Sequence, residues 1–207
     1  MSTVQVDAIN ESTTNAGVTV DGVLIKDGLV DGKDVSTLGT SSVDGGLVKL
    51  ADTDFTGESA VAFDSVFSST YRNYKTLISI KPVNNNVHLY YRFRDGSGDI
   101  SSSNYGNKAL YALNSNTNNF NNGYNRIAGA EGIIIAGCAQ NVAYHGYMDI
   151  LEPNIADRTG VVGMQTGTGH LLSNSGSFNL TTQLTGIKFK AETGNISGSI
   201  QIYGYAT

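Results

Sequence analysis

Short segments in which apolar and polar residues alternate recur from about residue 52 to the C-terminus. The clearest is residues 87–94, VHLYYRFR. Its apolar side consists of Val87, Leu89, Tyr91 and Phe93, and its other side of His88, Tyr90, Arg92 and Arg94. A period of two is the pattern of a β-strand with one face on a core. We therefore predict a strand with an apolar inner face and a polar, basic outer face.

Neighbouring segments extend this prediction to a β-sandwich. YKTLISIKP is predicted as a strand ended by Pro82 and NNN as a turn, which makes residues 74–95 a β-hairpin, with DGSG as the next turn. Further strands are predicted in AYHGYMDILEP, RTGVVGMQT, TGIKFKAE and SGSIQIYGYA. No amphipathic helical period occurs, and NKALYALN suffices for one helical turn at most. The spacing predicts an all-β protein with an antiparallel sandwich, and jelly-roll topology is favoured.

Residues 15–50 have a different pattern. Asp-Gly pairs recur at residues 21–22, 27–28, 31–32 and 44–45, with only a few residues able to pair between the first three. Their apolar residues are Val18, Val20, Val23, Leu24, Ile25, Leu29 and Val30. Because an isolated hairpin of this size is marginal in water, burial against other chains is expected. We predict a trimeric stalk of short strands at residues 1–50 and a β-sandwich tip at residues 51–207. Docking on a neighbouring protein and a flexible leader remain alternatives.

Composition narrows the class of protein. The 207 residues carry a net charge of −5 with a sequence pI of about 5.0, and no lysine or arginine cluster offsets it, so we expect no nucleic-acid partner. MSTVQVDAIN lacks the basic start and apolar stretch of a signal peptide. No run approaches the ~20 apolar residues of a membrane span, so we expect no membrane insertion. The single cysteine, Cys138, is interpreted as a small buried hydrophobic residue in a protein folded in a reducing cytosol, with a reactive thiol as the alternative.

Three segments resemble structural proteins of tailed bacteriophages, especially marine ones. INESTTNAGVTVDGVLIKDG resembles a motif that precedes a C-terminal domain in those proteins. FDSVFSSTYRNYKTLISI resembles the opening of that domain and SGSIQIYGYA its closing strand, although YGYAT stands where a Leu is expected after the Gly. The resemblance implies a homotrimeric virion fibre or spike whose tip is a jelly-roll-like β-sandwich.

This resemblance implies a virion protein that is assembled in the host cytoplasm. The N-terminal segment would attach it to another virion protein, and the tip would adhere to a glycan or an outer-membrane protein of the host. The short segment before the motif leaves two alternatives open, which are a head fibre or capsid decoration protein that stabilises the virion and a fragment of a longer fibre. A glycan-cleaving spike is a more distant alternative.

No motif of a common enzyme class is present. The chain lacks a G-x-S-x-G elbow, a P-loop and a dinucleotide fingerprint, and QTGTGH has neither the third glycine nor a following helix. Asp149 and Glu152 are carboxylates on or beside one strand, but a glycosidase needs two carboxyl groups across a cleft. We predict that the protein is not an enzyme and needs no cofactor.

The chain contains two sets of potential metal ligands. His88, His145 and His170 lie far apart in sequence and are interpreted as single residues on strand faces or in loops, with a shared metal site as the alternative. DTDFTGES begins like a calcium loop at Asp52, but Phe63 stands where that loop needs a glutamate. We interpret this segment as the linker between stalk and tip, without a metal.

The segment SSSNYGNKALYALNSNTNNFNNGYNR, residues 101–126, is the candidate host-binding loop. It is rich in asparagine and aromatic residues, and a loop of this length is usually functional or disordered. Asparagine amides donate and accept hydrogen bonds, while tyrosine supplies rigid contact area with a polar tip. The predicted contact residues are Tyr105, Tyr111, Asn119, Phe120 and Tyr124. The alternative is that the asparagines fill turns and the aromatic rings pack on strands or subunits.

Overall fold

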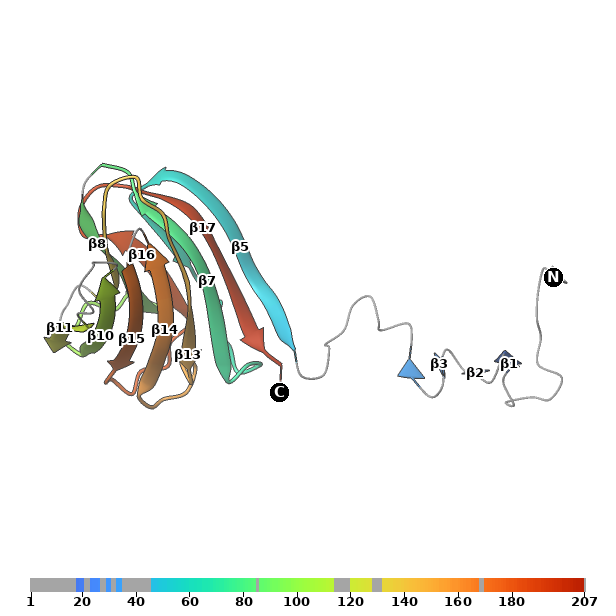
Figure 1. Ribbon diagram of the computed structural model, residues 1–207. Coiled ribbons are helices and arrows are strands. Elements are labelled where there is room, and N and C mark those ends of the chain that lie inside the picture. The colour runs from blue at the N-terminus through green and yellow to red at the C-terminus, as the bar shows by residue number, and fades with distance from the viewer. Residues whose placement is uncertain are drawn as a thin grey trace, which may run out of the picture. The chain divides into compact units, whose positions relative to one another are not determined.

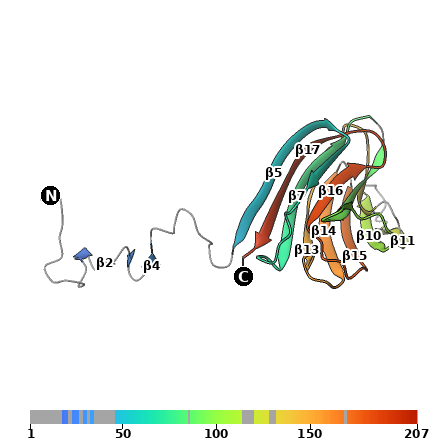
Figure 2. The same cartoon turned by 180° about the vertical axis from the view of Figure 1, so that it is seen from behind.

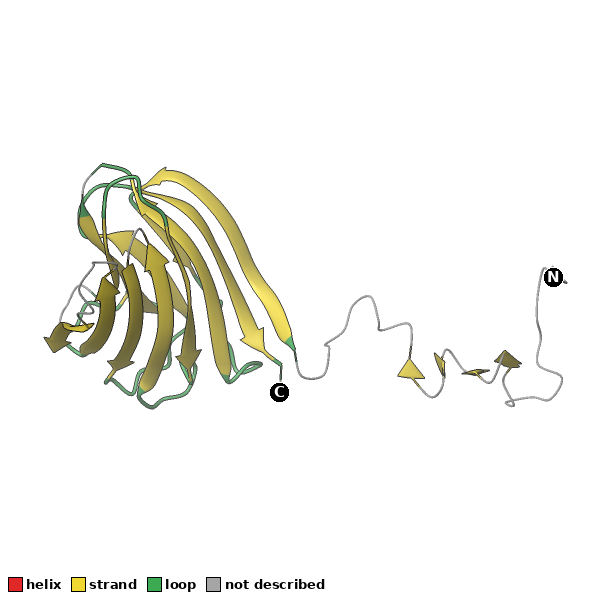
Figure 3. Cartoon of the chain, in the orientation of Figure 1, coloured by secondary structure: helices red, strands yellow, loops and turns green. Residues whose placement is uncertain are grey.

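The structure of the chain is a computed structural model (Figure 1). It describes residues 18–20, 23–26, 29–30, 33–34, 46–84, 86–113, 120–127, 132–167 and 170–206. The backbone alone is described for the strands before residue 46, for residues 111–113, 120–127 and 133–138, and for residue 170. Every regular element in the described ranges is a strand, so none of them is a helix that could cross a membrane (Figure 3).

The chain divides into two compact units, residues 1–43 and 44–207. The first contains a four-stranded antiparallel sheet in the order β1-β2-β3-β4. Its strands are β1 (Val18–Val20), β2 (Val23–Lys26), β3 (Leu29–Val30) and β4 (Lys33–Asp34). Asp-Gly pairs stand between consecutive strands, so the prediction of short strands in this segment is confirmed. Assembly of three such segments stays a prediction.

The second unit contains a large and a small antiparallel sheet, seen from both sides in Figures 1 and 2. The large sheet has the order β11-β10-β15-β14-β13-β7-β17-β5. Its strands are β5 (Leu47–Glu58), β7 (Asn73–Pro82), β10 (Tyr105–Leu113), β11 (Phe120–Ile127), β13 (Tyr144–Leu151), β14 (Thr159–Gly167), β15 (His170–Phe178) and β17 (Ile196–Tyr205). The small sheet has the order β12-β8-β16-β6, with β9 paired to β8. Its strands are β6 (Ala60–Phe63), β8 (Val87–Asp95), β9 (Gly98–Asp99), β12 (Ile133–Cys138) and β16 (Gly186–Ala191).

The strand order is that of a jelly roll with two insertions. The large sheet contains the run β5-β17-β7-β13, and the small sheet repeats it with the sequence neighbours, β6-β16-β8-β12. Each of these four pairs of consecutive strands therefore passes from one sheet into the other beside its neighbours, as in a jelly roll. The inserted strands β10, β11, β14 and β15 extend the large sheet. The predicted all-β, antiparallel, jelly-roll-like sandwich is confirmed.

The same topology makes the predicted hairpin at residues 74–95 wrong. Both strands form where expected, as β7 and β8, but they belong to different sheets and do not pair. Instead, β7 lies between β13 and β17, and β8 lies between β12 and β16. A short connection joins sequential strands equally well across a sandwich, so turn residues alone did not identify the partner.

The two sheets enclose one core. Leu89, Tyr91 and Phe93 of β8 are buried as the alternation predicted. The ring of Phe93 contacts rings of the opposite sheet, with centroid distances of 5.6 Å to Phe178 and 6.2 Å to Tyr105. Tyr90 points to the other face of the small sheet and is nevertheless fully buried, so that face is not uniformly exposed as expected.

Two further segments differ from their predicted structures. NKALYALN, expected to form at most a helical turn, lies in β10 except for its last residue. DTDFTGES, expected to be a linker, lies in β5 except for its last residue, and β5 pairs along its length with β17. The residues placed at the end of the stalk, 47–50, therefore belong to the first strand of the sandwich.

Candidate functional site

The outer face of the large sheet carries an exposed group of aliphatic side chains, which we call the apolar patch. Its members are Leu77, Leu110, Leu151, Val162, Met164 and Leu171. Their exposed fractions run from 39% for Leu77 to 64% for Leu110. Isolated exposed aliphatic residues are common on proteins, but a contiguous group is a signal of contact with another molecule.

A network of paired polar groups on β7, β13 and β17, the tyrosine network, adjoins the apolar patch, and its Tyr147 lies between Leu77 and Met164. The Lys75 amine lies 2.8 Å from an Asp149 carboxylate oxygen and 4.2 Å from the ring centroid of Tyr147. The Tyr205 hydroxyl donates a 2.6 Å hydrogen bond to the same carboxylate. Burial lowers the pKa of Lys75, but the bonds and charges of Asp149 and Tyr205 outweigh it and raise the pKa overall. The network is internally satisfied and carries no net charge when Lys75 and Asp149 are ionised.

A second network occupies the edge of the same sheet. Asp52 of β5 accepts hydrogen bonds from Lys49 at 2.9 Å and from Gln201 at 3.2 Å. The hydroxyl of Tyr203 donates to the Gln201 side chain at 3.0 Å. The Asp52 carboxylate therefore links β5 to β17. It does not begin a calcium loop, because an extended strand does not wrap around a cation.

The outer face of the small sheet carries an ionic cluster around Asp99. Arg94 and Lys188 both bond to the Asp99 carboxylate, and Arg94 also bonds to Asp64 at 2.6 Å. Burial raises the pKa of Asp99, but the Lys188 hydrogen bond and the charges of Lys188, Arg94 and Arg92 together lower it. The sequence of β8 alone predicted a basic face here. The acidic partners of Arg94, which are Asp64 and Asp99, lie outside β8, so they did not enter that prediction.

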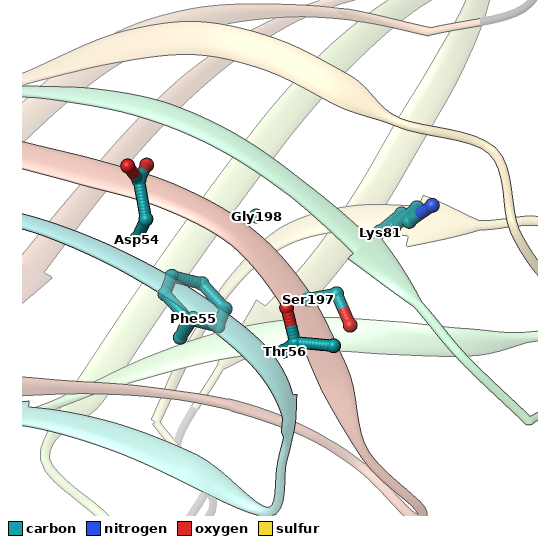
Figure 4. Close-up of a pocket in the computed structure, with 6 residues that line it drawn as sticks. All are labelled: Asp54, Phe55, Thr56, Lys81, Ser197 and Gly198. Atoms are coloured by element: carbon teal, nitrogen blue, oxygen red, sulfur yellow. The ribbon is translucent and has the colours of Figure 1, made fainter.

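A shallow hollow of about 440 Å³ lies near the turn between β5 and β6. It is lined by Asp54, Phe55, Thr56, Lys81, Ser197 and Gly198 (Figure 4). The Asp54 carboxylate and the Lys81 amine point away from each other in this view. The Ser197 hydroxyl already accepts a 2.9 Å hydrogen bond from the Gly57 amide. These polar groups do not converge on one point, so the hollow gives no reacting centre.

The segment predicted as one long host-binding loop forms two paired strands instead. Residues 105–113 and 120–127 are β10 and β11, which pair with each other, and β10 also pairs with β15. Tyr105 is only 2% exposed. Its hydroxyl accepts a 3.0 Å hydrogen bond from the Phe93 amide and donates one of 2.9 Å to the Ile100 carbonyl. The prediction of Tyr105 as a host-contact residue is therefore wrong, because its ring belongs to the core.

Three of the other predicted contact residues belong to the β10–β11 hairpin. Tyr111 lies in β10 opposite Asn121, and Phe120 and Tyr124 lie in β11. Their side chains, and the whole of Asn119, are outside the described residues. Since β11 is an edge strand of the large sheet, Phe120 and Tyr124 lie at that edge, and Tyr111 lies on the adjacent strand. Whether they contact a host stays a prediction.

The candidate metal and acid–base residues do not form a common site where the structure describes them. Among the described residues, no group of three or more His, Cys, Asp or Glu side chains is arranged to hold a metal ion. His88 bonds to Glu192 at 3.2 Å beside the small sheet, whereas His145 is on β13 of the large sheet. The side chains of His170 and Cys138 are outside the description. Asp149 belongs to the tyrosine network, and Glu152 pairs with Arg72.

The apolar patch is not among the features predicted from the sequence. RTGVVGMQT was correctly predicted as a strand, yet its outward residues Val162 and Met164 are as apolar as its inward Val161. The available signal is the pair of apolar residues at alternate positions on the outward face, because a strand with one solvated face normally has polar residues there.

Comparisons with protein-family models, curated proteins and solved structures find no match to the chain. The resemblance to phage structural proteins therefore stays a prediction.

Proposed function

We propose that this chain is a bacteriophage virion protein, a homotrimeric fibre or spike tip that adheres to the host cell surface. The single observation on which we rest the proposal is the arrangement of the large sheet. The chain enters the sandwich through β5 at one edge, and the β10–β11 hairpin forms the opposite edge (Figure 1). A tip held through its first residues would present that far edge to a host.

The composition of the hairpin suits a neutral glycan. Residues 101–126 contain many asparagines and few charges, and three of the proposed contact residues are aromatic: Tyr111, Phe120 and Tyr124. Aromatic faces pack on the C–H surfaces of sugars, while Asn119 and its neighbours exchange hydrogen bonds with hydroxyls. Each contact is weak, but three copies on one particle raise the avidity by ~10²-fold or more where the sites engage together.

Binding of the purified full chain to host cells tests this proposal. We expect Phe120→Ala or Tyr124→Ala to lower the apparent affinity by about tenfold, which corresponds to the loss of ~1.4 kcal/mol per site. Tyr203→Ala is the matched control, because it removes a tyrosine on β17, near the opposite edge of the sheet. Circular dichroism and light scattering establish that each variant keeps its fold and association state. Parental binding by folded hairpin variants would exclude the hairpin as the contact.

A capsid decoration protein is the second candidate function, and the apolar patch favours it, because a decoration protein also needs a surface for firm contact. Labelling of intact virions separates the two proposals. Signal at the tail or at fibres supports the adhesin, and signal spread over the head supports decoration. Absence of the protein from purified virions would contradict both.

A further inference from the structure

We propose that the apolar patch is the surface on which a second copy of this chain docks. The proposal rests on the homo-oligomeric part of the proposed function and identifies the face that would carry it. The residues concerned come from five strands of the large sheet, β7, β10, β13, β14 and β15.

The strand register makes the patch continuous. Leu77, Tyr147 and Met164 lie opposite one another on β7, β13 and β14. The same row continues through Ser173 of β15 to Leu110 of β10. Four inter-strand steps of about 4.8 Å make this row roughly 19 Å long. Val162 is two residues from Met164 along β14, and Leu171 is two residues from Ser173 along β15. The last member, Leu151, is two residues along β13 from Asp149, and Asp149 lies opposite Val162.

The size of the patch fits a protein interface. The six side chains together expose on the order of 500 Å², which is near the upper limit for the largest patch of a typical monomer. A stable interface buries about 800 Å² on each partner. The apolar patch alone is smaller than that, so the contact would also include polar side chains around it, among them those of the tyrosine network. Tyrosines and aliphatic residues at the centre with polar groups around them are the usual composition of such interfaces.

The charge of this face favours a second copy over a partner of opposite charge. The chain as a whole carries a net charge of −5. On this face, however, Lys75 and Asp149 neutralise each other at 2.8 Å, and Lys108 lies at the margin opposite Ser175. Two copies of a surface with a large net charge of one sign repel each other, and this face has no such charge among its described residues. A strongly charged partner would instead require unpaired charges of one sign.

The relief of the patch also suits a closed trimer, in which one part of the patch meets a different part of the patch on the next copy. β15 presents the small side chains Ser173 and Ser175 on this face. On one side they lie opposite the larger Met164 and Val162 of β14. On the other side they lie opposite Leu110 and Lys108 of β10. A row of small residues beside rows of large ones on one face allows the large row of one copy to pack over the small row of another. The N-terminal unit adds a second reason for association, since strands of two to four residues are marginal alone.

Photo-crosslinking of the full chain tests this inference. The photoreactive residue p-benzoylphenylalanine replaces Val162, which is 51% exposed at the centre of the patch. In the control it replaces Ile155, which is 41% exposed in the connection between β13 and β14. After irradiation we expect covalent dimers and trimers of the chain from position 162 and only monomer from position 155. Sedimentation velocity before irradiation gives the association state.

Three outcomes would overturn the inference: a monomeric chain at all concentrations, an oligomer without crosslinks from position 162, or crosslinks from both positions alike. The same probe in assembled virions provides a further test. Crosslinks to another copy support the inference, and crosslinks only to a capsid protein overturn it in favour of decoration. The adhesin proposal is judged separately, by virion labelling and cell binding, so either can fail without the other.

Discussion

At the scale of single residues, Gly198 of β17 shows why a glycine is required inside a central strand. Its φ is +148°, which side chains rarely adopt, and β17 is irregular there in its pairing with β5. A Cβ atom at this position would lie 1.9 Å from the Ser79 carbonyl oxygen of the adjacent strand. The contact is with backbone, so no side-chain rotation relieves it.

We therefore expect Gly198→Ala to lower the free energy of unfolding by ~3 kcal/mol or more, combining backbone strain with a steric clash. Gly96→Ala is the matched control, because nothing lies within 4 Å of a Cβ there and its φ is outside the strained range. Urea denaturation followed by circular dichroism measures both. Equal stabilities of the two variants would contradict this account of the strand.

At the scale of elements, the period-two alternation was sufficient to predict β7, β8, β13, β14, β16 and β17. It failed for β10 and β15 because their inner faces are partly polar. Asn107 and Asn174 are buried, and the Asn174 amide donates a 2.7 Å hydrogen bond to Gln165 of β14. Side chains that bond to each other across strands replace the apolar residues that the alternation needs. The alternation also does not predict the sheet to which each strand belongs, since that depends on contacts between distant segments.

The candidate site also depends on contacts between distant segments. Residues 101–126 lack alternation, so their sequence predicts a loop with Tyr105 exposed. Tyr105 is a core residue because its neighbour on β15 is Phe178, whose ring centroid is 4.8 Å away. The apolar patch is made of residues on five strands, and only the register of those strands brings them together. A sequence read strand by strand contains its members but not their adjacency.

The ionic cluster makes a prediction about the elements it joins, β8, β9 and β16. Asp99 accepts bonds from Arg94 and Lys188, and its pKa in the folded protein is below its ordinary value of 3.8. The ionised carboxylate therefore stabilises the fold at neutral pH, and this contribution is lost as the pH falls below about 4 through the folded-state pKa. We expect Asp99→Asn to be less stable than the parent protein at pH 7 and to approach it in stability at pH 3.

Thermal unfolding across this pH range measures the difference, with Asp54→Asn as a control on the exposed edge strand β5. A difference between Asp99→Asn and the parent that is the same at pH 3 and pH 7 would mean that packing rather than charge accounts for the effect.

At the scale of the whole molecule, the two units differ in whether each can be stable without the other. The hydrophobic core lies within residues 44–207, and both sheets of the sandwich belong to that unit. A chain of this length can bury most of the surface that it exposes when unfolded. The strands of residues 1–43 are at most four residues long, which is too short for independent stability.

We therefore expect residues 44–207, produced without the first unit, to unfold cooperatively. If the apolar patch joins the copies, the midpoint of thermal unfolding should rise by roughly 2–4 °C for each tenfold increase in protein concentration, because association stabilises the folded state by mass action. Val162→Lys in the same fragment should remove the concentration dependence while preserving the near-ultraviolet circular dichroism. Calorimetry at several concentrations measures both. A midpoint independent of concentration in the unmodified fragment would contradict association through the apolar patch. A fragment without a cooperative transition would show that the sandwich depends on residues 1–43 for its fold.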